Sequence, residues 1–196
     1  MTHSLGDAGL DLLFRNARSR NAWQDRPIDR ATIEALWELV KMGPTSYNSL
    51  PGRFVFLQSS AAKERLKPHL MASNVDKTMK APLCVVIAYD SKFQDFLPQT
   101  FPAYDAKPSF DANPALTEAT AKRNSAMQGA YLIIAARALG LDCGPMSGFN
   151  ADGVDKEFFP DGRWKSNFLC NIGYGTDENL RPRAPRLSFE QACLVL

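Results

Sequence analysis

Apolar residues recur at helical spacing in three long segments of this chain. Residues 7–20 carry an apolar face at positions i, i+3, i+4 and i+7. A second segment begins after Asp29, which is well suited to cap a helix, and reaches Val40. The longest helix is predicted over 114–140, ending at Gly140. We expect its core-facing stripe to consist of Met127, Ala130, Tyr131, Ile134 and Ala138.

Four other segments have the composition of strands. Residues 83–89 form a continuous apolar run rich in β-branched side chains, which is typical of a strand buried on both faces. Further strands are predicted over 53–58, 141–146 and 167–174. Shorter helical segments are predicted near 60–67, 74–80 and 154–159.

Residues 41–56 join the second helix to the first strand and are rich in polar groups. Gly43 and Pro44 end the helix, and five polar side chains follow in succession. Such a loop can present several donors and acceptors to a flat polar ligand. The alternative is an ordinary capped turn between a helix and a strand, where serine, asparagine and proline are common.

Two further segments lack a regular pattern. Residues 91–113 hold five aromatic residues and three prolines. A loop of this length often acts as a lid or binding loop, and the alternative is that its aromatic side chains pin it to the core. The tail, 176–196, is polar and proline-rich until its last three residues, so it cannot bury much of its own surface. Docking on a second subunit is the simplest use for it.

Composition narrows the class of protein. With 196 residues, 45% of them hydrophobic, the chain is long enough for one domain with a full core. A net charge of +2 argues against nucleic acid or a membrane surface as the main partner. No signal peptide or membrane-spanning stretch is recognisable. The cysteines are far apart in apolar surroundings, which favours buried thiols in the cytoplasm: Cys84, Cys143, Cys170 and Cys193.

Common catalytic motifs are absent from the sequence. Two histidines and four scattered cysteines do not make a zinc site. There is no GxxxxGK[ST] phosphate loop, and Gly173 and Gly175 lack the third glycine of a dinucleotide fingerprint. Ser147 does not stand in a GxSxG motif. No catalytic side chain is identified, so a reaction here would depend on a cofactor.

Four separated pieces of the sequence form an ordered set of short motifs. The first is 17–23, ARSRNAW, a basic segment with a serine and a following aromatic residue. The second, PTSYNSLP at 44–51, matches P-[ST]-S-x-N-x-x-P. The third is NVDK at 74–77, and the fourth is RAP at 183–185. Their order and spacing cover nearly the whole chain, and together they resemble the motifs of the FMN-dependent nitroreductase family.

Longer stretches resemble the malonic semialdehyde reductase branch of that family, which serves the Rut pathway of pyrimidine degradation. They lie at 43–48, 120–133, 137–149, 165–175 and 185–193. This resemblance implies reduction of malonic semialdehyde to 3-hydroxypropionate. A broad nitroaromatic or quinone reductase of the same fold is an alternative, and so is a flavin-binding protein without turnover.

The family resemblance implies an α+β fold, in which a small, mostly antiparallel sheet is flanked by helices. Residues 1–196 would form a single nitroreductase-like domain. The implied protein is an interlocked homodimer, with the tail added to the partner's sheet and two FMN sites at the interface. NADPH or NADH would donate hydride in a ping-pong reaction, and the sequence does not rank the two.

The resemblance also implies which residues bind FMN. Arginine suits the phosphate because its planar guanidinium makes charge-assisted hydrogen bonds. The phosphate end is assigned to Arg18, Ser19, Arg20, Asn21 and Arg183, with Arg181 a weaker candidate. The ribityl and pyrimidine end is assigned to Asn74 and Lys77, and the ring to the backbone of Pro145, Met146, Ser147 and Gly148. The partner subunit would contribute Pro44, Thr45, Ser46 and Asn48.

Two parts of the sequence depart from the common family pattern. Leu50 and Gly52 stand where glutamine and tryptophan are frequent, which weakens the expectation of a broad nitroaromatic or quinone preference. Asn21 replaces a frequent second basic residue, so phosphate binding would depend on the arginines. Arg53 and Lys107 are candidate cations for a substrate carboxylate.

Overall fold

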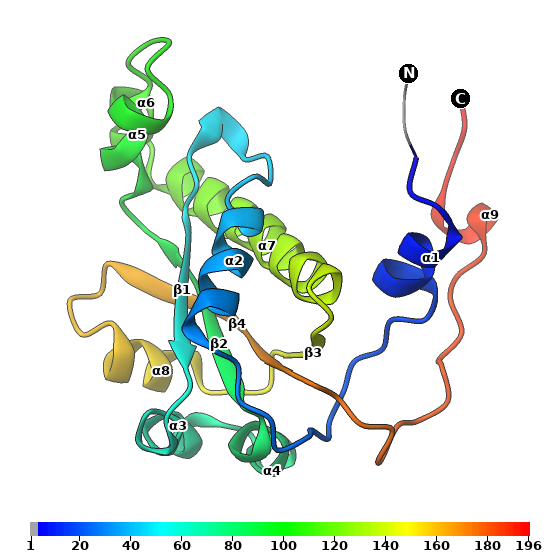
Figure 1. The fold of residues 1–196 in the computed structure, drawn as a ribbon. Helices are drawn as coiled ribbons and strands as arrows, with labels where there is room; N and C mark the ends of the chain where they lie inside the picture. The colour runs from blue at the N-terminus through cyan, green and yellow to red at the C-terminus, as the bar shows by residue number, and fades with distance from the viewer. Residues whose placement is uncertain (1–3) are drawn as a thin grey trace.

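Four antiparallel strands form the centre of the fold, in the order β1-β2-β4-β3 (Figure 1). This computed structural model describes residues 4–196. The inner strands are β2 (Leu83–Asp90) and β4 (Trp164–Gly173). The edges are β1 (Gly52–Leu57) and β3 (Asp142–Met146). The predicted α+β fold with a small antiparallel sheet is confirmed.

Helices cover both faces of the sheet (Figure 1). On one face lie α2 (Arg30–Val40) and α7 (Pro114–Ala138). On the other lie α3 (Ser60–Leu66), α4 (Ala72–Lys80) and α8 (Ala151–Phe158). No helix within the described part of the chain is long and apolar enough to cross a membrane.

The remaining helical segments are short, and most belong to the ends of the chain or to the connections. The first predicted helix stops at Arg15, because residues 19–23 are extended beside β3 and the tail. Figure 1 shows both ends of the chain leaving the sheet on the same side. These segments are α1 (Asp7–Leu10), η1 (Asp11–Arg15), η2 (Ser46–Asn48), η3 (Lys67–His69), η4 (Phe93–Phe96), α5 (Leu97–Thr100), α6 (Lys107–Asp111) and α9 (Phe189–Ala192).

β2 is the most buried element, as its continuous apolar run predicts. All eight of its residues are buried. Val86 lies opposite Val55 of β1 and Leu169 of β4. Since side chains alternate between the faces of a strand, Val86 enters the core beneath α3 and α8, whereas Ile87 enters the core beneath α2 and α7. The two cores meet at this strand.

The predicted core stripe of α7 was wrong. Met127 and Tyr131 are 40% and 37% exposed, and Ala130 and Ala138 are also exposed. The buried side of the helix is small and polar in its first part, with Thr117, Thr120, Ala121, Asn124, Ser125, Gln128 and Gly129, and apolar in its last part, with Leu132, Ala135 and Ala136. Ile134, the fifth predicted member, is half-buried, so most of the apolar stripe lies on the surface of the single chain.

The polar side of α7 is buried because it holds the loop that precedes β1. The Asn124 side chain accepts a hydrogen bond from the Ser46 backbone at 2.8 Å. The Gln128 side chain accepts one from the Gly52 backbone at 2.7 Å. Backbone N–H groups that leave water need such partners. The need to bind these backbone N–H groups buries the polar side of α7, although the opposite side is more apolar.

Residues 91–113 contain η4, α5 and α6, so the predicted irregular loop was wrong. Phe93 and Phe110 are buried and their ring centroids lie 5.1 Å apart. Phe96 and Tyr104 remain 42% and 56% exposed. Some aromatic side chains thus pin the segment to the core, while others form its surface.

Three of the four cysteines are buried free thiols, as expected. Cys84, Cys143 and Cys170 are buried and unpaired. Burial raises the pKa of Cys84 to about 12, which keeps it protonated near neutral pH. Cys193 is exposed, contrary to expectation, because the end of the tail does not pack against the rest of the chain.

The N-cap of α7 provides a test of the fold. The Asn113 side chain accepts a hydrogen bond from the Leu116 backbone at 3.1 Å. We expect Asn113→Ala to lower the free energy of unfolding by about 1 kcal/mol, because it removes this cap. Asn113→Asp keeps an oxygen acceptor and is the matched control, with a change below about 0.5 kcal/mol. Urea unfolding measures both, and equal losses would contradict the cap's role.

Candidate functional site

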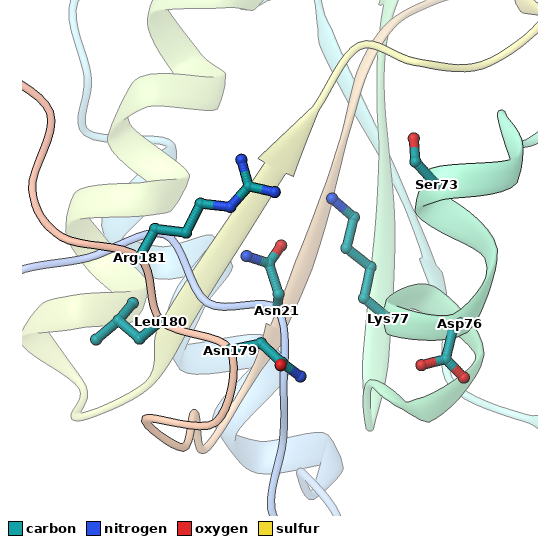
Figure 2. Close-up of a pocket in the computed structure, with 7 residues that line it drawn as sticks. All are labelled: Asn21, Ser73, Asp76, Lys77, Asn179, Leu180 and Arg181. Atoms are coloured by element: carbon teal, nitrogen blue, oxygen red, sulfur yellow. The ribbon is translucent and has the colours of Figure 1, made fainter.

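A cavity of about 830 Å³ opens between α4, the extended segment 19–23 that follows η1, and the tail. Figure 2 shows Lys77 and Arg181 reaching toward the same space, with Asn21 between them. Burial lowers the pKa of Lys77, since its ammonium group is partly removed from water. The complete lining is Asn21, Ser73, Asp76, Lys77, Asn179, Leu180 and Arg181.

The extended segment is fixed by backbone pairing on both sides. The Arg20 N–H donates to the Cys143 carbonyl of β3 at 2.9 Å. The Thr176 N–H of the tail donates to the Ala22 carbonyl at 3.0 Å. Gly144 makes the close approach possible, because a Cβ there would lie 2.5 Å from the Arg20 carbonyl oxygen. The first motif is therefore held between β3 and the tail.

A second cavity of about 250 Å³ adjoins the first, and the two share Asn21, Leu180 and Arg181. Every charged residue in its lining is basic. Within residues 4–196, none of these arginines has a carboxylate within 4.0 Å. The five are Arg18, Arg137, Arg181, Arg183 and Arg186.

Backbone carbonyls hold several of these arginines in place. Arg183 Nη2 donates to the carbonyls of Arg15 and Ala17, at 2.7 and 3.0 Å. Arg137 Nη1 donates to the Leu13 carbonyl at 3.0 Å, and Arg18 donates to a carbonyl of the tail. A guanidinium carries five N–H donors. The remaining donors make the cavity suited to an anion.

Arg20 does not line either cavity, although it stands in the same motif. Its guanidinium lies 3.5 Å from an Asp142 oxygen, pairs with Asp177 and donates to the Thr176 carbonyl at 3.2 Å. Burial lowers the pKa of Arg20, but the Asp177 hydrogen bond and the charges of both aspartates together raise it by more. The pKa of Arg20 therefore lies above its usual value. Arg20 thus joins β3 to the tail.

Asn74 and the predicted ring-binding backbone at 145–148 lie together. Asn74 Nδ2 donates to the Gly148 carbonyl at 2.8 Å, and the Met71 N–H donates to the same oxygen at 3.0 Å. A Cβ on Gly148 would lie 2.7 Å from Asn74 Nδ2. Met146 is buried beneath α4, whereas Pro145 and Ser147 are exposed. These contacts fix the end of β3 against α4.

The loop with Pro44, Thr45, Ser46 and Asn48 is not part of these cavities. It precedes β1 and lies at the end of the sheet opposite α4 (Figure 1). Asn48 Nδ2 donates to the Thr100 carbonyl at 2.7 Å, which ties the loop to α5. Within a single chain, the structure does not bring this loop together with Asn74 or Lys77.

The same loop has an unusual backbone. Tyr47, Asn48 and Leu50 have φ values of 55°, 45° and 42°, in the left-handed region that favours glycine. The Tyr47 ring meets Phe101 and Phe110 edge to face, with centroids 5.4 and 5.6 Å away. These contacts and the α7 hydrogen bonds compensate for the strained conformation.

The two candidate cations for a substrate carboxylate are already neutralised. Arg53 Nη2 lies 2.7 Å from Asp90 Oδ2, and Arg163 binds the same carboxylate. Lys107 Nζ lies 2.6 Å from Asp111 and 3.3 Å from Asp95. Neither cation is free for another anion in this arrangement.

Sequence reasoning missed several residues of the cavities. Arg137 lies in the last turn of α7, where a basic residue usually only complements the helix dipole. Arg186 follows two other arginines in a polar tail, and nothing marks it out. No group of three or more potential metal ligands is found among residues 4–196.

The family of this chain follows from its similarity to known proteins. The model of the nitroreductase family matches residues 15–174. This chain belongs to the nitroreductase family. A relative from Rhodopseudomonas palustris (strain TIE-1), provisionally named NADH dehydrogenase/NAD(P)H nitroreductase, is 60% identical over 196 residues, covering 100% of both chains. The nitroreductase family is a family of oxidoreductases, so this chain is an enzyme.

Solved nitroreductase structures share the fold. The FMN complex of a provisionally named nitroreductase from Exiguobacterium sibiricum 255-15 has a TM-score of 0.84 and 19% identity, covering 100% of both chains. A provisionally named NAD(P)H:FMN oxidoreductase from Staphylococcus epidermidis ATCC 12228 also has a TM-score of 0.84, with 18% identity. That alignment covers 100% of this chain and 99% of the other.

The different roles of Arg20 and Arg18 can be tested. We expect Arg20→Met to lower the free energy of unfolding by about 1–2 kcal/mol, because it removes the ion pairs with Asp142 and Asp177 and the hydrogen bond to the Thr176 carbonyl. Arg18→Met is the matched control, with an expected change below about 0.5 kcal/mol. Urea unfolding at constant ionic strength measures both. An Arg20 variant as stable as the Arg18 variant would show that the ion pairs do not join β3 to the tail.

Proposed function

We propose that this nitroreductase is an FMN-dependent NAD(P)H oxidoreductase that reduces malonic semialdehyde to 3-hydroxypropionate in pyrimidine degradation. The observation that carries the flavin assignment is the pair of adjoining cavities. Arginines without a carboxylate partner among residues 4–196 line the smaller one, and Lys77 lines the larger one. The substrate assignment is supported by the sequence stretches that resemble the malonic semialdehyde reductase branch.

The residues present fit FMN. Its phosphate carries nearly two negative charges, which suits a cavity whose charged lining is entirely basic. The larger cavity is polar and of ample volume for the rest of the molecule. When bound, FMN takes a hydride from a nicotinamide nucleotide and transfers it to a second substrate.

The chain's own residues would bind and orient the cofactor. Arg18 and Arg183 would hold the phosphate, with Ser19 and Asn21 as hydrogen-bonding partners. Lys77 would place its positive charge in the larger cavity, where partial burial strengthens its attraction to an electron-rich group. Because the Asn74 amide nitrogen already binds the Gly148 carbonyl, Asn74 would offer its oxygen to the cofactor.

We propose an interlocked homodimer, because one chain leaves its site incomplete. The loop at 44–48 lies away from α4 and would complete the site of the partner. The exposed stripe on α7 supplies an apolar surface, with Met127 and Tyr131 at its centre. Leu194 and Val195 are 80% and 79% exposed at the end of the tail, which suits strand addition to the partner's sheet. The buried free thiols support a cytoplasmic location.

Two other functions are alternatives to the proposed one. The name of the Rhodopseudomonas relative favours reduction of nitro compounds by the same fold. A flavin-binding protein without turnover would contain the same cavities but would not react with nicotinamide nucleotides. The two half-reactions distinguish these functions from the proposed one.

The proposed reaction predicts a reversible change in colour. The purified protein, reconstituted with FMN, should lose its flavin absorbance when NADPH or NADH is added without oxygen. Malonic semialdehyde should then restore that absorbance, because it accepts the hydride. Absorbance spectroscopy measures both steps, and a nitroaromatic and a quinone serve as comparison oxidants.

Each outcome of this experiment has a distinct meaning. Recovery with the comparison oxidants but not with the aldehyde would favour the nitro/quinone reductase. A flavin that NAD(P)H does not bleach would favour a binding protein without turnover. A protein that cannot be reconstituted with FMN would overturn the flavin assignment itself.

The shared site predicts that dimerisation and flavin retention depend on the tail. Deletion of residues 180–196 should yield a monomer that loses FMN, because it removes the docking segment and the tail arginines together. Full-length Arg183→Met is the control, which should stay dimeric and bind FMN at least about tenfold more weakly. Light scattering and flavin absorbance measure the two properties. A yellow, dimeric truncated protein would contradict the proposed assembly.

A further inference from the structure

The smaller cavity carries more positive charge than one phosphate requires. Five guanidinium groups line it, whereas the FMN phosphate would supply at most about two negative charges. Arg18 and Arg183, with the hydroxyl of Ser19, are sufficient partners for one phosphate. Three charges of Arg137, Arg181 and Arg186 are then left without a compensating anion.

This excess does not reflect a general scarcity of carboxylates. Elsewhere in the chain, arginines are commonly paired, as Arg53 and Arg163 are with Asp90 and Arg65 is with Glu157. In the cavity, by contrast, the only hydrogen-bond acceptors that the described residues give these arginines are backbone carbonyls. Carbonyls fix the position of a guanidinium but do not neutralise it.

Arg137 is the most firmly placed of the three excess arginines. It comes from the last turn of α7, is half-buried, and is held by the Leu13 carbonyl at 3.0 Å. Arg181, Arg183 and Arg186 are exposed, so water screens their charges, whereas Arg137 is half-buried. A half-buried charge beside like charges is unfavourable unless an anion accompanies it. A side chain fixed in this way therefore points to a second anionic group in the bound state.

We propose that the smaller cavity binds two phosphate groups at once, one more than FMN carries. The inference rests on the proposed function, because the first phosphate is that of FMN. The second phosphate has two chemical sources: the 2′-phosphate of NADPH, or the additional phosphate of a flavin with a diphosphate linkage such as FAD. In the first case the enzyme prefers NADPH to NADH.

The first arm of the test uses two ligands that differ by one phosphate. The FMN-loaded protein is titrated by calorimetry with adenosine 2′,5′-bisphosphate and with adenosine 5′-monophosphate. We expect the bisphosphate to bind at least about tenfold more tightly, the effect of one further charge-assisted contact. Neither ligand can transfer hydride, so the result does not depend on activity.

Matched variants identify the residues responsible. Arg137→Met and Arg186→Met should each reduce the advantage of the bisphosphate by about tenfold while FMN stays bound. Arg123→Met is the control, since Arg123 is an exposed arginine on the same helix and lies outside the cavity. Arg186 is exposed, so its variant remains informative even if Arg137→Met fails to fold.

A second arm compares FMN with FAD on the flavin-free protein. Tighter binding of FAD, together with no preference for the bisphosphate, would support two phosphates but assign the second one to the flavin. Equal binding within each pair of ligands would overturn the proposal. If the wild-type protein binds no flavin, the proposed function fails, and titration of the flavin-free protein with the two adenosine phosphates tests the cavity by itself.

Discussion

The open edge of β3 is the constraint on which the candidate site depends. An edge strand exposes backbone donors and acceptors that need partners. Here the Cys143 carbonyl accepts from Arg20, and the adjacent extended segment in turn pairs with the tail. Gly144 allows the backbones to approach. Side chains from both ends of the chain therefore meet beside a rigid sheet, although the tail has no core of its own.

The arginines of this nitroreductase differ in their partners within residues 4–196: some pair with a carboxylate, and others bind only backbone carbonyls. Around Asp90, which is fully buried, Arg53 and Arg163 neutralise the carboxylate, and Arg163 also lies 3.4 Å from Asp95 in the segment 91–113. Around the smaller cavity, carbonyl oxygens orient the arginines without cancelling their charge. The first arrangement satisfies a buried charge, and the second leaves positive electrostatic potential available for a ligand.

Much of the fold could be predicted from the sequence, because local patterns carry it. The buried run of β2 was confirmed, as was the Asp29 cap of α2. The buried face of α7 could not be predicted, since it depends on the loop backbone that Asn124 and Gln128 satisfy. At the site, motif spacing predicted which segments take part, but it did not predict the direction in which each side chain points. Arg20 therefore turned out to bind carboxylates.

The left-handed backbone of the loop before β1 has a consequence for assembly. Each such non-glycine conformation costs about 1–2 kcal/mol. In the single chain, the aromatic contacts of Tyr47 and the hydrogen bond from Ser46 to Asn124 of α7 offset this cost. A molecule that docks against this loop encounters a surface with little conformational entropy left to lose. Docking against this loop would therefore require little further ordering of its backbone.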